Sequence, residues 1–310
     1  MPTVAAAALQ PLLSVRDLCI SSSSIRAVRS ANLEVWPGRT TAVVGESGSG
    51  KSMLALSLMG LLPRGFAVQT GSAVFCQNGT SADLASMGPK GWRGIRGSQI
   101  AMVFQEPMTS LNPVLCVGEQ VMEAVRERGS AAARRRAAME AMVAAGLRDP
   151  LGLMRSFPHE LSGGMRQRVV IAIALACGPA LLIADEPTTA LDVTVQAEVL
   201  DTIRGLATDR GLGVLLITHD LGLVARYADE VVVMRAGRTL ERGPVRAVLE
   251  TPRHEYTKAL FLARPSLRRR SDVLAMVKPE VSDRNESLLV EVSAGHFVLG
   301  TAEPVLGGPP

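Results

Sequence analysis

The chain has 310 residues, of which 47% are hydrophobic and 20% charged, and its net charge is +4. This composition can bury a substantial core, which excludes a disordered protein. It also argues against a nucleic-acid-binding protein, because the basic residues are mostly dispersed and aromatic residues, which stack on bases, make up only 3%.

The first predicted elements are strands. Residues 12–20 and 31–36 have strand-like composition, with the serine run 21–24 after the first and the turn Pro37-Gly38 after the second. The turn is followed by residues 40–44, whose composition predicts a buried strand.

Residues 45–52 match the phosphate-loop pattern of Gly, four free positions and Gly-Lys-Ser. They follow the predicted strand and precede residues 53–59, which have helix-forming composition. The glycines let successive N–H groups face one concavity, and the helix N-terminus adds its unpaired donors, so the loop can hold a polyphosphate. In this pattern Lys51 reaches the β- and γ-phosphates, and the Ser52 hydroxyl binds Mg²⁺.

The next stretch carries one candidate ligand. We expect a strand at residues 72–76 and an exposed insertion at 78–97, which is rich in glycine and polar residues. The apolar run 100–104 ends at Gln105, whose carboxamide oxygen could reach Mg²⁺ if this strand lies beside the phosphate-loop strand. Residues 117–146 have helical composition, which predicts a helical subdomain inserted between two halves of a nucleotide-binding core.

A second helix N-terminus suited to phosphate follows. Residues 161–168 open a predicted helix that ends at Gly178-Pro179. Ser162 is a good N-cap candidate, and the two glycines after it leave the following amides bare.

Two more predicted strands end in polar residues. Residues 181–184 are followed by Asp185 and Glu186. The carboxyl ends of core strands meet the ligand in open parallel sheets, so Asp185 is placed to hold the Mg²⁺ shell and Glu186 to polarise the attacking water. Residues 213–218 form another buried strand, and His219 after it occupies the place of a γ-phosphate sensor.

The cysteines and apolar stretches bear on the compartment. The four cysteines make no Cys-x-x-Cys pair, so we expect reduced thiols in a cytosolic protein. Residues 1–13 lack the basic region of a secretory signal. The uncharged, mostly apolar stretch 169–184 is too short to span a membrane, so we expect membrane association only through a partner or a surface contact.

Taken in order, these motifs resemble the nucleotide-binding subunit of an ATP-binding-cassette (ABC) transporter. The matches are the phosphate loop 45–52, the Q-loop Gln105, the signature 161–167, the Walker B Asp185 with Glu186, the D-loop 190–192 and the switch His219. The resemblance implies an α/β P-loop NTPase core of ABC-cassette type, with an antiparallel β-subdomain and a helical subdomain inserted at about 106–178. Residues 1–265 would form the nucleotide-binding domain and 266–310 a C-terminal tail.

The resemblance also implies the site residues. The catalytic residues would be Lys51, Glu186 and His219, and the metal ligands Ser52, Gln105 and Asp185. The nucleotide would be bound by Gly45, Glu46, Ser47, Gly48, Ser49, Gly50, Lys51, Ser52, Gln105, Ser162, Gly163, Gly164, Gln167 and Asp192. The family works as a head-to-tail dimer, in which the signature of one subunit closes over the ATP held by the phosphate loop of the other.

The implied cofactors are ATP and Mg²⁺. The implied partners are a second ABC ATPase subunit, identical or related, two integral-membrane permease subunits and an extracytoplasmic solute-binding protein, with no nucleic acid. The implied location is peripheral, on the cytoplasmic face of the cell (inner) membrane.

A narrower resemblance is to importers of oligopeptides, dipeptides and nickel. Residues 104–113 are similar to the extended Q-loop of that branch, and residues 253–260 to its C-terminal His-Pro-Tyr-Thr segment, with Glu255 in place of the proline. Some members carry a cysteine cluster in the tail; residues 266–310 contain no cysteine, so we expect no iron–sulfur cluster. The implied function is ATP hydrolysis that energises import of a peptide-class solute.

The alternatives are import of nickel or another small solute, a non-transport ABC ATPase acting on DNA or ribosomes, and a regulatory module that does not hydrolyse ATP. DNA-repair relatives insert long coiled coils before the signature and ribosome-acting relatives usually carry two cassettes, whereas this chain has one cassette and no sustained heptads. A non-hydrolysing module would have Glu186 or His219 replaced, and both are present.

One feature departs from the family pattern. Relatives place an aromatic residue near the end of the first strand, where it stacks on adenine, but residues 20–25 contain none. We therefore expect weak base contacts from Ser22 or Ile25.

Overall fold

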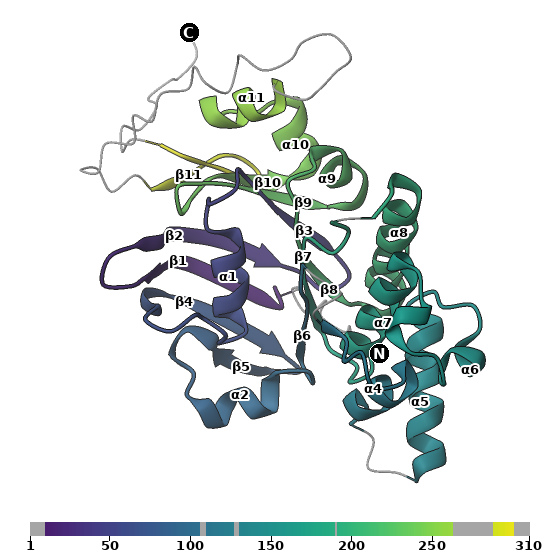
Figure 1. Cartoon of the computed structure of the whole chain (residues 1–310). Coiled ribbons are helices and arrows are strands. Elements are labelled where there is room, and N and C mark those ends of the chain that lie inside the picture. The colour runs from purple at the N-terminus through teal and green to yellow at the C-terminus, as the bar shows by residue number, and fades with distance from the viewer. Residues whose placement is uncertain (1–9, 106–109, 127–129, 190, 263–287, 301–310) are drawn as a thin grey trace, which may run out of the picture.

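The computed structural model describes residues 10–105, 110–126, 130–189, 191–262 and 288–300 (Figure 1). The strands in these ranges are β1 (Leu13–Ser21), β2 (Arg26–Val35), β3 (Thr40–Val44), β4 (Ala67–Gln77), β5 (Thr80–Asp83), β6 (Ile100–Val103), β7 (Leu181–Asp185), β8 (Gly213–Ile217), β9 (Glu230–Arg235), β10 (Arg238–Pro244), β11 (Leu289–Ser293) and β12 (His296–Leu299). The helices are α1 (Lys51–Leu58), α2 (Pro89–Ile95), α4 (Val117–Ala124), α5 (Ala131–Ala144), α6 (Pro150–Leu153), α7 (Gly163–Leu175), α8 (Val193–Arg210), α9 (Leu221–Tyr227), α10 (Val245–Glu250) and α11 (Glu255–Leu262), with 3₁₀ turns at Leu84–Ser86 and Pro158–Glu160.

The centre of the sheet is parallel. β3 lies between β8 and β9, and β7 and β6 continue the parallel order beyond β8. Every residue of β3, β7 and β8 is buried, which fits their mostly apolar sequences, because strands of a parallel sheet are covered on both faces. The carboxyl ends of β3 and β7 therefore deliver Gly45 and Glu186 to the same edge of the sheet.

β1, β2, β4 and β5 form the antiparallel part of the sheet, and α2 lies beside them (Figure 1). The predicted exposed insertion at residues 78–97 is exposed at most of its positions, but Leu84 and Trp92 are buried in the core and hold the segment against the sheet. β1 and β4 meet at a bulge, where Asp17 and Gly71 both have positive φ. A Cβ at Gly71 would lie 2.4 Å from the Asp17 carbonyl oxygen, so the close approach requires glycine.

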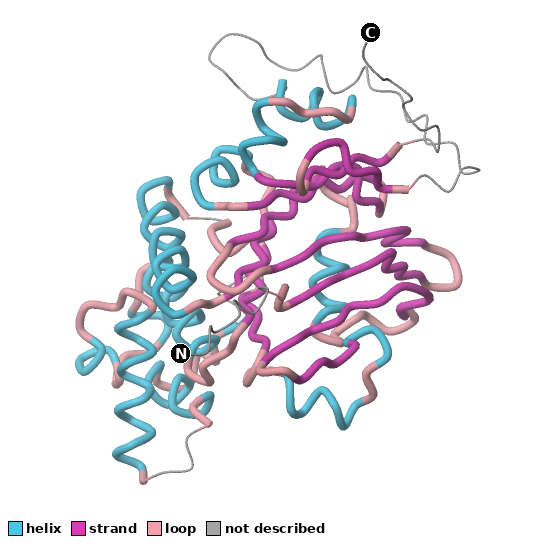
Figure 2. The backbone as a smooth tube through the Cα atoms, turned by 180° about the vertical axis from the view of Figure 1, so that it is seen from behind, coloured by secondary structure: helices cyan, strands magenta, loops and turns pink. Residues whose placement is uncertain are grey.

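The helices α4 to α8 gather at one side of the sheet, away from β1, β2, β4 and β5 (Figures 1 and 2). α4, α5 and α7 pack together around Val121, Met142 and Ile171, which are fully buried. The expected fold class is thus confirmed: a parallel α/β core, an antiparallel β-subdomain and a helical part inserted between β6 and β7. Among the described helices, none has both the length and the apolar character needed to cross a membrane.

The last described elements lie at the β9–β10 part of the sheet. β10 pairs antiparallel with β9, β12 pairs with β10, and β11 pairs with β12. The sequence analysis assigned no secondary structure to residues 266–310, so the hairpin of β11 and β12 is a new element. It joins residues 289–299 to the core sheet.

Candidate functional site

The phosphate loop has a backbone that requires glycine at two positions. Gly45 and Gly50 have φ of 154° and 99°. A Cβ at Gly45 would lie 2.1 Å from the carbonyl oxygen of Met234, and one at Gly50 would lie 2.6 Å from that of Ala27. The loop is therefore pressed against β9 and β2, and Gly50 serves as the N-cap from which α1 begins at Lys51.

The Lys51 side chain is held within this loop. Its Nζ donates to the carbonyl oxygens of Gly45 and Glu46, both at 2.9 Å, and to Ser49 Oγ at 3.3 Å. Burial lowers the pKa of Lys51, while the nearby charges of Glu186 and Asp185 act in the opposite direction. The ammonium thus lies between the loop and the carboxylates that follow β7.

Asp185, the last residue of β7, faces the start of α1. Ser52 Oγ donates to Asp185 Oδ1 at 3.3 Å. Burial raises the pKa of the Asp185 carboxyl, and the hydrogen bond from Ser52 partly offsets this. The hydroxyl and the carboxylate therefore present two oxygen atoms close together.

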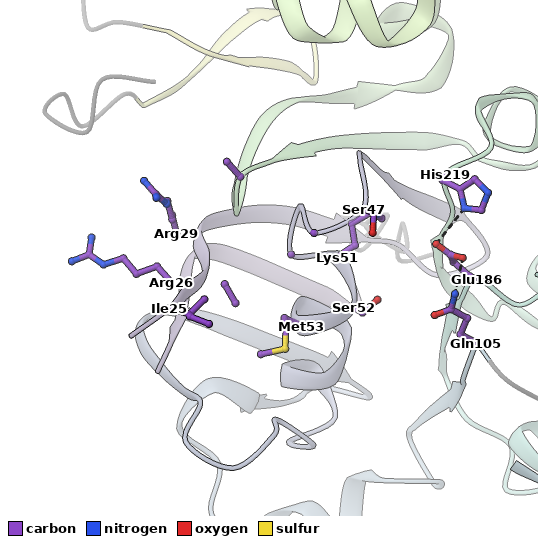
Figure 3. Close-up of a pocket in the computed structure, with 14 residues that line it drawn as sticks. Ile25, Arg26, Arg29, Ser47, Lys51, Ser52, Met53, Gln105, Glu186 and His219 are labelled. Carbon is purple, nitrogen blue, oxygen red and sulfur yellow. Dashed lines mark hydrogen bonds and ion pairs between the residues drawn. The ribbon is translucent and has the colours of Figure 1, made fainter. Parts of the chain in front are cut away.

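Three side chains converge on the Glu186 carboxylate, and two of them, Gln105 and His219, are drawn beside it in Figure 3. Oε2 accepts hydrogen bonds from Gln105 Nε2 at 3.1 Å and from Thr189 Oγ1 at 3.0 Å, and Oε1 lies 3.3 Å from His219 Nδ1. Glu186 has φ of 47°, a left-handed conformation that is rare for a residue with a Cβ and that is often found at functional sites. The ends of β6, β7 and β8 therefore supply one orientated carboxylate.

Thr189 was missed by the sequence analysis. The signal for it was present, since Thr189 lies three residues after Glu186 and its backbone N–H donates to the Glu186 carbonyl. In a turn of this length, the hydroxyl of the fourth residue can donate a hydrogen bond to the carboxylate of the first, as Thr189 does to Glu186.

A cavity of about 700 Å³ joins these groups. It brings together eight residues that the sequence predicted for the site, namely Ser47, Gly48, Gly50, Lys51, Ser52, Gln105, Glu186 and His219. It is also lined by residues that the sequence analysis did not select, namely Arg26, Ala27, Arg29, Met53 and Ala236. Ile25 lines it as well, whereas Ser22 and Ser23 do not. Figure 3 places Ile25 and Met53 on the side of the cavity away from His219.

The signature residues and Asp192 do not line this cavity. Ser162 Oγ caps α7 by accepting from Met165 N–H at 3.3 Å, and Asp192 Oδ1 caps α8 by accepting from Val195 N–H at 3.0 Å. The first turns of α7 and α8 lie against each other. A Cβ on Gly164, in the first turn of α7, would lie only 2.3 Å from Cγ1 of Val195, in the first turn of α8. The structure thus groups them on a second, exposed surface of the chain.

Two other predicted residues of this region behave differently. Gly163 is exposed and a Cβ there would meet only Leu191 Cδ2, at 3.5 Å. Gln167 is 1% exposed, and its Nε2 has no hydrogen-bond partner among the described residues. Ala190 of the D-loop and residues 106–109 of the extended Q-loop lie outside the described residues.

The oxygen atoms of Ser52 and Asp185 fit a Mg²⁺ ion. Mg²⁺ is usually held by one or two protein oxygens, with waters and phosphate oxygens completing the octahedron. In the described part of the chain no cluster of three His, Cys, Asp or Glu residues could hold a metal ion by itself, and the four cysteines are free thiols. The donor set therefore suits a metal that arrives with a nucleotide.

Known proteins resemble this chain along most of its length. Residues 28–189 match the family model described as ABC transporter. A Brucella ovis protein named for peptide import and ATP binding is 49% identical over 83% of this chain and 79% of its own length. The dipeptide transport ATP-binding protein of Bacillus subtilis is 44% identical over 84% of this chain and 78% of its own length. A dimeric structure of an ATP-binding cassette in a post-hydrolysis state, bound to ADP and Pi, is similar with a TM-score of 0.64 and 26% identity, over 76% of this chain and 99% of that one.

Proposed function

Since the chain belongs to the ABC transporter family, we propose that it is the ATP-hydrolysing subunit of an importer for peptide-class solutes. The observation that carries the hydrolytic role is the convergence of Gln105, Thr189 and His219 on Glu186, at a cavity that also contains Lys51. The solute class is supported by the relatives, whose names specify peptide import and dipeptide transport.

In the proposed mechanism, the loop amides and Lys51 bind the phosphates of ATP. Glu186 acts on the attacking water: its Oε2 is occupied by Gln105 and Thr189, which fixes the plane of the carboxylate so that Oε1 can accept a proton from water. His219, which is 3.3 Å from Oε1 and lines the same cavity, is proposed to contact the terminal phosphate.

Ser52 and Asp185 would hold Mg²⁺, with Gln105 contributing its carboxamide oxygen. When bound, the ion supplies positive charge to the phosphate oxygens. The Gln105 nitrogen already donates to Glu186, so the carboxamide oxygen is the atom left for this role.

The exposed surface formed by Ser162, Gly163 and Asp192 is proposed to complete the site of a second ATPase subunit, identical or related. The dimeric form of the similar cassette supports this arrangement. From the family we also propose the remaining partners, namely two permease subunits and an extracytoplasmic solute-binding protein. We propose that the chain is bound peripherally on the cytoplasmic face of the inner membrane. The helical part at about 106–178 is proposed to lie against the permease.

The solute class can be tested on the complex purified through a tag on this chain and supplied with its solute-binding protein. We expect mixed dipeptides and oligopeptides to stimulate ATP hydrolysis severalfold and nickel chloride to have no effect. Stimulation by nickel alone would replace the peptide assignment with the alternative of a nickel importer, and would leave the ATPase role intact.

The base end of the cavity leads to a prediction about nucleotide selectivity. Its lining includes Ile25, Ala27 and Met53 but no aromatic side chain. Contacts from the phosphate loop do not distinguish one base from another. Stacking of the base on an aromatic ring contributes ~1–3 kcal/mol to binding. We expect the isolated subunit to show little preference for ATP over GTP, and Ile25→Tyr to tighten ATP binding about tenfold, which is about 1.4 kcal/mol.

Isothermal titration of both nucleotides against both proteins measures this. Val114→Tyr is the control, because Val114 is 75% exposed and does not line the cavity. Placing the ring at Ser22 or Ser23 should gain less, since neither residue lines the cavity. Strong ATP selectivity in the unmodified protein, unchanged by the tyrosine, would show that another residue already recognises adenine.

A further inference from the structure

Tyr256 is a buried residue that the proposed mechanism does not use. It lies in the first turn of α11 and is 1% exposed. It belongs to the same buried apolar cluster as Val44, at the end of β3, and Val233 of β9, and the Arg235 guanidinium lies 4.7 Å from its ring centroid. The ring is therefore buried in the core beside β3, the strand that precedes the phosphate loop.

The Tyr256 hydroxyl touches that loop. Tyr256 Oη accepts a hydrogen bond from the backbone N–H of Glu46 at 3.4 Å, although the two residues are 210 positions apart. The carbonyl of the same Glu46 accepts from Lys51 Nζ at 2.9 Å. Glu46 is thus held from two directions, by Lys51 and by Tyr256.

Burial, followed by the charge of the nearby Glu46, raises the pKa of Tyr256 to about 12. The phenol therefore stays neutral at any pH at which ATP hydrolysis is measured. Its role is geometric, since it carries no charge to the nucleotide and does not itself line the cavity.

The segment that carries Tyr256 is tied to one buried carboxylate. Glu241 of β10 is 0% exposed. Its oxygens accept from the backbone N–H groups of Arg253 at 2.8 Å and His254 at 3.0 Å. Tyr256 N–H in turn donates to His254 Nδ1 at 3.0 Å. Glu241 therefore fixes the turn from which α11 and its tyrosine start.

The C-terminal hairpin supplies the partner of that carboxylate. His296 Nε2 lies 2.7 Å from Glu241 Oε1, and His296 is 1% exposed. β12 pairs with β10 at this point, Glu241 opposite Val298. A buried carboxylate is costly unless its oxygens are well hydrogen-bonded, and His296 adds a third partner to the two backbone N–H groups, so docking of the hairpin stabilises Glu241 in the position that the turn requires.

We propose that Tyr256 is a positioning residue for the phosphate loop, and that the β11–β12 hairpin holds it in place through the contact of His296 with Glu241. This proposal rests on the proposed function, because it assigns the control of nucleotide affinity at the same site. It gives the β11–β12 hairpin, which lies beside β10, an effect on ATP binding that is transmitted through Glu241 and Tyr256 (Figure 1).

The first test is Tyr256→Phe in the full chain, which removes only the hydroxyl and keeps the ring beside Arg235. We expect the Kd for ATP to rise about three- to tenfold, the effect of losing one net hydrogen bond. In the assembled complex the KM should rise in the same proportion, with kcat changed less than about twofold, because Glu186 is untouched.

Tyr227→Phe is the matched control. Tyr227 is the other tyrosine of the chain, is 4% exposed, and donates its hydroxyl to the Ala197 carbonyl at 3.2 Å, on α8. We expect both variants to lower the melting temperature slightly, and only Tyr256→Phe to change the Kd. A folded Tyr256→Phe protein that binds ATP as the unmodified chain does would overturn the proposal, whereas an unmodified chain that bound no ATP would instead overturn the proposed function.

The second test addresses the hairpin. His296→Leu should raise the Kd as Tyr256→Phe does, and the double variant should show no further rise, because the hairpin acts through the tyrosine. His159→Leu is the control, since that ring stacks on Phe157 in the helical part. If His296→Leu does not fold, His296→Gln, which keeps a donor, replaces it and should raise the Kd at least twofold. Additive effects, or no effect of a folded His296 variant, would contradict the proposed link.

Discussion

Substituting Glu186→Gln should lower the steady-state ATPase rate of the assembled transporter by at least about 100-fold, the contribution typical of a positioned general base. Glutamine keeps the shape of the side chain, and its carbonyl oxygen can still accept from Gln105 and Thr189. It lacks the negative charge that draws a proton from water. ATP binding should survive, because the phosphate loop and Lys51 are unchanged.

A coupled-enzyme assay of the purified complex measures the rate, and titration of the isolated subunit measures the affinity. Glu250→Gln is the control, since Glu250 is an exposed carboxylate that pairs with Arg246 on α10, away from the cavity. An ATPase rate near that of the unmodified complex in Glu186→Gln would remove Glu186 from the mechanism.

Ser162→Arg should abolish ATP-dependent dimerisation while leaving ATP binding by the isolated subunit unchanged. Ser162 is exposed at the start of α7 and does not line the cavity of its own chain, so an arginine there cannot reach its own nucleotide. It would place a bulky cation between the two subunits. The ATPase rate of the complex should fall on the order of 100-fold, the scale for losing a donor that faces a developing charge.

Ser130→Arg separates this effect from the loss of a helix cap. Ser130 Oγ caps α5 by accepting from Ala133 N–H at 3.2 Å, as Ser162 caps α7, so both substitutions remove an N-cap. Size-exclusion chromatography with ATP, on proteins that also carry Glu186→Gln, measures dimerisation. Loss of ATP binding by the Ser162→Arg monomer would show that the signature acts within its own chain.

The parts of the site that could be predicted from sequence are those with local causes. The phosphate loop is contiguous, and its glycines, lysine and serine follow one another in a fixed pattern, so Lys51 and Ser52 could be selected as candidates directly from the sequence. Asp185 and His219 follow buried strands, and parallel strands end at one edge. The position of each strand end was therefore enough to bring these groups together.

Other features depend on contacts between distant segments and left no local signal. The contact between Tyr256 and Glu46 joins residues 210 positions apart. The segment 78–97 looked exposed because its composition is polar, but Trp92 anchors it. The sequence offered Ser22 or Ile25 for contact with the base, and only the folded turn between β1 and β2 shows that Ile25 lines the cavity and Ser22 does not.

If ATP hydrolysis by this chain energises peptide import, proteoliposomes that contain the complex should take up peptide. The complex purified through this chain is reconstituted with ATP and Mg²⁺ enclosed, and a labelled peptide is supplied outside with the solute-binding protein. We predict accumulation that requires enclosed ATP and falls to background with Glu186→Gln. Accumulation without ATP, or accumulation unchanged by Glu186→Gln, would contradict the claim.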